Sequence, residues 1–187
     1  VPAWAPAALN SGRYRTRKAV ATSLAEYREQ IEASEALYHV DGPDVSVAVL
    51  RAKETGHLSM MINGKPDAAT GGDMGTQVLL GQLPVLLHPN PQEALVIGLG
   101  SGVTAGAVLT APVKHLDVIE IAREVAEASR LFDPWSGAPL DDDRTALWVC
   151  DARDYLLLNQ EQRYDIIVSE PSNPWMAGIG NLMTVEF

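Results

Sequence analysis

The chain has 187 residues, which is enough for one domain with a small addition. Hydrophobic residues make up 47% of it and charged residues 20%, as is typical of a globular domain. A formal net charge of −10 argues against nucleic acid as a partner, because a phosphate backbone requires a basic surface. The single cysteine and four scattered histidines predict neither an internal disulfide nor a metal site. No apolar run is long enough to cross a bilayer, and no signal peptide is evident.

The first 70 residues predict a leader, a helix and a small β addition. Apolar residues at helical spacing, with Thr22 or Ser23 as N-cap, predict a helix over 22–38 after a basic, alanine- and proline-rich leader. Two strand-like runs at 45–50 and 57–62 predict a hairpin. The expected domains are a leader with the N-terminal helix at 1–44, the β addition at 45–70 and a Rossmann-like domain at 71–187.

Two helices are expected in the Rossmann-like domain. The apolar segment 74–87 predicts the first, with a break near Pro84 because proline has no backbone N–H to donate. The segment 122–132 is amphipathic and predicts the second.

A glycine-rich turn follows the first predicted strand of this domain. The apolar run 94–97 stops at Gly98-Leu-Gly100-Ser-Gly102, and Glu120 closes the next apolar run 22 positions after Gly98. Glycines let the backbone turn sharply and approach a ligand closely. A carboxylate at the end of the second strand is placed to accept hydrogen bonds from ribose hydroxyls. The pattern therefore predicts a nucleoside site.

Two further predicted strands also end in acidic residues. The run 145–150 leads into Asp151, and the run 164–169 leads into Glu170. The carboxyl ends of parallel strands meet at one edge of a sheet, where α/β folds bind ligands. The expected fold class is α/β, a Rossmann-like methyltransferase-type doubly wound sheet preceded by a small N-terminal β-hairpin domain. Such a sheet normally continues, so we expect C-terminal strands beyond residue 187.

Two motifs and the order of elements point to one family. The first motif runs from Asn63-Gly64 to Gln77, and the second is Glu170-Pro-Ser-Asn173-Pro-Trp175. Together they resemble the spermidine synthases, the polyamine aminopropyltransferases, from about residue 45 onward. They look closest to bacterial spermidine-synthase-like proteins in which such a domain is joined to membrane-spanning segments. The resemblance implies a homodimer that is cytoplasmic or forms the cytoplasmic domain of a membrane protein.

The resemblance also implies a reaction and its residues. The reaction moves an aminopropyl group, without a metal, from decarboxylated S-adenosylmethionine to an amine such as putrescine or another polyamine. Glu170 would be catalytic, Glu120 would hold the ribose and Asp151 would lie beside the adenine amino group. The implied cofactor-binding residues are Gly98, Gly100, Ser101, Gly102, Glu120, Ile121, Asp151 and Ala152. The implied substrate-binding residues are Asp67, Asp73, Gln77, Asn173 and Trp175.

Several positions depart from the family pattern on the amine side. Ser101 stands where the family has an aspartate for the aminopropyl ammonium, and Asn173 replaces a second carboxylate. Glu170 is one methylene longer than the family's aspartate. Two alternatives stay open at this point. One is a methyltransferase that uses ordinary S-adenosylmethionine, which neutral Ser101 favours, and the other is a non-catalytic nucleoside-sensing domain of a membrane protein.

Overall fold

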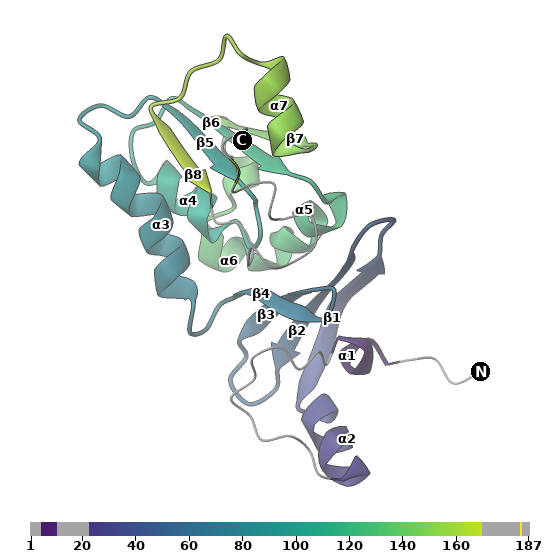
Figure 1. The fold of residues 1–187 in the computed structure, drawn as a ribbon. Coiled ribbons are helices and arrows are strands. Elements are labelled where there is room, and N and C mark those ends of the chain that lie inside the picture. The colour runs from purple at the N-terminus through teal and green to yellow at the C-terminus, as the bar shows by residue number, and fades with distance from the viewer. Residues whose placement is uncertain (1–4, 11–22, 170–183, 185–187) are drawn as a thin grey trace. The chain divides into compact units, whose positions relative to one another are not determined.

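A computed structural model describes residues 5–10, 23–169 and 184 of the chain (Figure 1). The chain divides into two compact units, 1–74 and 75–187, and each is described by itself. Glu170, Asn173 and Trp175 lie outside the described residues.

The first unit is built around an antiparallel sheet of four strands in the order β1-β2-β3-β4. Its helices and strands are α1 (Pro6–Leu9), α2 (Leu24–Glu32), β1 (Ser34–Asp41), β2 (Ser46–Ala52), β3 (Leu58–Ile62) and β4 (Lys65–Ala69). Val47, Val49 and Met60 are completely buried, so the centre of the sheet carries the core of this unit. The turn between β3 and β4 is Asn63-Gly64, with φ of 50° and 76°, as tight hairpin turns of this kind require.

Two sequence predictions for this unit differ from the structure. The predicted helix 22–38 ends at Glu32, and the residues from Ser34 onward form β1 instead. The reason is strand pairing, since β1 pairs with β2 from Ser34 opposite Ala52 to Asp41 opposite Ser46. The hairpin at 45–62 is present as β2 and β3, but it forms the middle of a wider sheet.

The second unit contains a parallel sheet of four strands in the order β7-β6-β5-β8. Its elements are α3 (Met74–Leu87), β5 (Glu93–Ile97), α4 (Val103–Leu109), β6 (His115–Glu120), α5 (Arg123–Ser129), η1 (Arg130–Phe132), α6 (Asp133–Ser136), η2 (Pro139–Asp141), β7 (Thr145–Val149), α7 (Ala152–Leu158) and β8 (Ile166–Ser169). The chain builds β5, β6 and β7 outward and then returns to place β8 on the other side of β5. This order is that of a Rossmann-like fold, and it confirms the predicted fold class.

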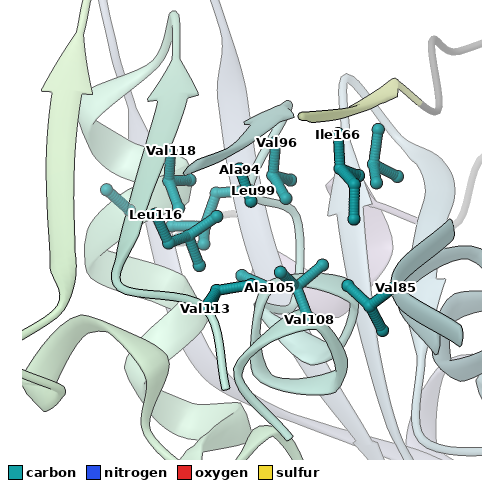
Figure 2. Close-up of a cluster of buried hydrophobic side chains, with 12 residues drawn as sticks. Val85, Ala94, Val96, Leu99, Ala105, Val108, Val113, Leu116, Val118 and Ile166 are labelled. Carbon is teal, nitrogen blue, oxygen red and sulfur yellow. The ribbon is translucent and has the colours of Figure 1, made fainter. Parts of the chain in front are cut away.

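Helices cover both faces of the parallel sheet, as Figure 1 shows. On one face, Val96, Val118 and Ile166 pack with Val85 of α3 and Val108 of α4 (Figure 2). Alternate strand residues point to the opposite face, where α7 contributes to a second cluster. That second cluster contains Leu95, Ile97, Ile119, Ala152 and Tyr155.

The predicted break of α3 at Pro84 is wrong. The helix continues to Leu87, and the N–H of His88 still donates to the carbonyl oxygen of Pro84 at 3.0 Å. Proline removes only one donor from the ladder, and burial of the next residue, Val85, in the core holds the last turn in place.

Candidate active site

The glycine-rich turn between β5 and α4 has the backbone conformation that its sequence predicts. Gly98, Gly100 and Gly102 all have positive φ, at 89°, 52° and 78°. Residues other than glycine rarely adopt these backbone angles. The N–H of Gly98 donates to the carbonyl oxygen of Ile119 at 2.8 Å, so the start of the turn is fixed to β6. A Cβ at Gly98 would meet no atom within 4 Å, which leaves open space beside the backbone.

Glu120 ends β6 and connects this strand to the turn. Its Oε2 accepts a hydrogen bond from the N–H of Leu99 at 3.0 Å, and its Oε1 accepts one from Ala122 at 3.0 Å. The residue is 7% exposed. Burial raises the pKa of its carboxyl, and the hydrogen bonds from backbone N–H groups counteract only part of that effect. The next residue, Ile121, is exposed and offers an apolar surface beside the carboxylate.

Ser101 and Gln77 were predicted for different ligands, and the structure brings them together. The Ser101 hydroxyl donates to Oε1 of Gln77 at 2.5 Å, and both residues are buried. The Thr104 hydroxyl donates to the carbonyl oxygen of Gln77 at 3.1 Å. These bonds attach the glycine turn and α4 to α3. Ser101 therefore supports the turn with a neutral side chain.

Asp151 lies between β7 and α7 and is the N-cap of that helix. Its Oδ1 accepts hydrogen bonds from the N–H groups of Arg153 at 2.7 Å and Asp154 at 3.2 Å. The side chain is exposed, whereas Ala152 is buried at 8% exposure. Glu120 and Asp151 thus follow neighbouring parallel strands at the same edge of the sheet.

The predicted amine-side acids Asp67 and Asp73 belong to the first unit. Asp67 Oδ1 accepts a hydrogen bond from Lys65 Nζ at 2.8 Å, and Asp73 Oδ2 accepts one from the N–H of Ala69 at 3.1 Å. Both carboxylates therefore have partners nearby in the sequence, on β4 of that unit.

Sequence reasoning missed one buried acid, Asp117. It lies in the middle of β6 and is 2% exposed. The signal available in the sequence was an aspartate inside the apolar run His-Leu-Asp-Val-Ile-Glu.

The described part of the chain offers neither a metal cluster nor a membrane-spanning helix. No group of three His, Cys, Asp or Glu side chains there is arranged to hold a metal ion. None of its helices combines the length and the apolar character that a membrane span needs.

The strand order, the glycine turn and the acids after β6 and β7 define a Rossmann-like domain of the methyltransferase type. The chain belongs to the spermine/spermidine synthase domain family, whose sequence model matches residues 74–184. This confirms the resemblance to the spermidine synthases.

Relatives of known name agree with the family. The chain is 29% identical over 139 residues to a polyamine aminopropyltransferase of Caldicellulosiruptor bescii, covering 72% of this chain and 48% of that protein. It is 26% identical over 145 residues to spermidine synthase of Dictyostelium discoideum, covering 77% of this chain and 50% of that protein. The chain thus spans about half the length of these curated relatives.

A solved structure shares the fold. It is a crystal structure of a spermidine synthase in complex with the transition-state analogue AdoDATO. The TM-score is 0.72 at 23% identity, over 81% of this chain and 51% of the other.

Proposed function

We propose that this chain supplies the nucleoside site of an aminopropyltransferase. The enzyme would move an aminopropyl group from decarboxylated S-adenosylmethionine to an amine such as putrescine. The observation that carries the proposal is the position of Glu120, which ends β6 and accepts the N–H of Leu99 in the glycine turn. Membership of the family and the names of the relatives support the same reaction.

The nucleoside is assigned to the carboxyl edge of the parallel sheet. Glu120 accepts backbone N–H groups through both of its oxygens, and we assign the two ribose hydroxyls to the same carboxylate. Asp151 uses Oδ1 for its cap, which leaves Oδ2 for the adenine amino group. Exposed Ile121 is assigned to the adenine face, where burial of its side chain would add apolar contact.

The transfer itself needs alignment more than acid catalysis. A bond forms between the acceptor nitrogen and the carbon beside the sulfonium. The bond from that carbon to sulfur breaks, and methylthioadenosine leaves with the electron pair. The attacking amine must lose a proton, and we assign that proton to Glu170, which lies outside the described residues.

The amine side carries less negative charge than the family pattern provides. We assign the amine to Asp67, Asp73, Gln77, Asn173 and Trp175. The Ser101 hydroxyl is bonded to Gln77, so the donor's ammonium loses one charge-assisted hydrogen bond. Such a bond contributes about 1.5–3 kcal/mol, so we expect the donor to bind about ten- to a hundredfold more weakly than it would with an aspartate there.

Calorimetric titration with two donors tests the proposal. We expect the chain to bind decarboxylated S-adenosylmethionine more tightly than ordinary S-adenosylmethionine. The variant Glu120→Gln should weaken both donors by about tenfold or more, because both carry the same ribose.

The opposite preference would contradict the aminopropyl assignment. Tighter binding of ordinary S-adenosylmethionine, with release of S-adenosylhomocysteine in the presence of an amine, would indicate methyl transfer. If Glu120→Gln then weakened both donors equally, the nucleoside site would still be supported. The preference for ordinary S-adenosylmethionine would nevertheless contradict the assigned reaction.

A further inference from the structure

Asp117 is a buried carboxylate that no step of the proposed transfer uses. It lies in β6 between Leu116 and Val118, which face the core shared with α3 and α4. Because strand side chains alternate, Asp117 points to the other face, as Ile119 does, where α7 packs. A charge in such a place is costly unless it is well hydrogen-bonded.

Side chains from three other segments and from β6 itself surround this carboxylate. Trp148 of β7 donates from Nε1 to Oδ1 at 2.7 Å, and Nε2 of His115 in β6 lies 3.1 Å from the same oxygen. The Tyr164 hydroxyl, from the loop before β8, donates to Oδ2 at 2.7 Å, and the Tyr155 hydroxyl of α7 does so at 3.2 Å. The two hydroxyls also lie 3.2 Å from each other.

The hydrogen bonds keep the carboxylate ionised. Burial alone would raise the pKa of Asp117, but the hydrogen bonds from Tyr164 and Trp148, with His115 nearby, bring it below its usual value. Burial is also the main reason that the pKa values of Tyr155 and Tyr164 are raised. Both phenols therefore stay protonated near neutral pH and act as donors.

Tyr155 connects this carboxylate to the start of α7. Its backbone N–H donates to the carbonyl oxygen of Asp151 at 3.0 Å, so the two residues lie one helical turn apart. Its ring packs against Trp148 with a centroid distance of 5.3 Å, and the residue is 7% exposed. Tyr155 therefore links the Asp117 carboxylate to the cap of α7.

We propose that Asp117 is a positioning residue which, through Tyr155, sets the place of Asp151 for adenine recognition. The inference rests on the proposed function, which assigns Asp151 to the adenine amino group. An apolar side chain would fill the same space without the cost of burying a charge. An acceptor at this place instead holds the Tyr155 hydroxyl, and with it the first turn of α7.

The structure offers a matched pair of variants for the test. Tyr155→Phe and Tyr164→Phe each remove one hydroxyl from Oδ2 of Asp117 and keep the ring. Only Tyr155 lies on α7, whereas Tyr164 lies in the loop before β8. A role that is merely structural predicts the same kind of effect from both, namely a loss of stability.

The readout is the preference for an amino group on the purine. Dissociation constants are measured by calorimetry for methylthioadenosine and for methylthioinosine, which has a carbonyl oxygen in place of the 6-amino group. The ratio is the dissociation constant of methylthioinosine divided by that of methylthioadenosine. We expect Tyr155→Phe to lower this ratio by at least about threefold, and Tyr164→Phe to change it by less than about 1.5-fold. Asp117→Leu, which offers no acceptor to the Tyr155 hydroxyl, should lower the ratio in the same direction as Tyr155→Phe.

Two controls separate the possible failures. The ratio for methylthioadenosine against its 2′-deoxy form should stay constant in all variants, since ribose recognition is assigned to Glu120. Thermal unfolding checks that each variant is folded. An unchanged purine ratio in a folded Tyr155→Phe, or an equal drop in Tyr164→Phe, would overturn the role of Asp117. A wild-type chain that does not discriminate between the two purines would overturn the adenine assignment itself, and this inference with it.

Discussion

Glu120 has a structural task and, in the proposed function, a binding task in one buried carboxyl group. Its two oxygens accept N–H groups from Leu99 on one side and Ala122 on the other, which fixes the glycine turn to the end of β6. Burial raises the pKa of the group, so the folded chain takes up this proton at a higher pH than the unfolded chain does. By linkage, the contribution of Glu120 to the unfolding free energy falls as the pH rises through that interval.

Nucleoside affinity should depend on pH through the same group. The ionised carboxylate is the better acceptor for ribose hydroxyls, so we expect methylthioadenosine to bind more weakly as the pH falls through the raised pKa of Glu120. The loss should begin at a higher pH than an exposed glutamate with a pKa of about 4.3 would give. Calorimetric titrations over a pH series measure it. Glu120→Gln should bind weakly with a much flatter profile, and parallel profiles for the two proteins would contradict the assignment.

At the scale of elements, α4 begins directly after the glycine turn and is in close contact with α3. A Cβ added to Gly81 of α3 would lie 2.5 Å from the carbonyl oxygen of Thr104 in α4. The two helices also share the hydrogen bond from the Thr104 hydroxyl to Gln77. This contact leaves no room for a larger residue at position 81.

The helix contact predicts opposite effects for two glycine substitutions in α3. Gly81→Ala should destabilise the chain by about 1–3 kcal/mol, because α3 must move away from α4. Gly75→Ala is the control, since a Cβ there meets nothing within 4 Å. It should be neutral or stabilising by up to about 1 kcal/mol, because alanine favours helix more than glycine does. Denaturant unfolding measures both, and equal effects would show that the contact does not limit position 81.

The sequence predicted local elements better than contacts between them. The strands of the second unit and the turn at Gly98 follow from apolar runs and glycines, and the structure confirms them. Strand β1 was mistaken for helix because its partner, β2, is what stabilises it as a strand. The bond between Ser101 and Gln77 joins residues 24 positions apart, and no local pattern indicates it.

At the scale of the whole molecule, the proposed nucleoside residues all belong to the second unit, which is also where most of the family match lies. The glycine turn, Glu120 and Asp151 come from three successive strand ends of one parallel sheet. The proposed nucleoside site therefore includes no residue of the first unit, whereas the assigned amine-side acids Asp67 and Asp73 belong to it.

Hydrogen exchange with and without methylthioadenosine tests the central claim most directly. If the nucleoside binds at the carboxyl edge of the parallel sheet, exchange should slow at 98–102, 120–122 and 151–154, while β1 to β4 of the first unit keep their rates. Slowing confined to the amino ends of β5 and β6, or to the first unit, would contradict the account.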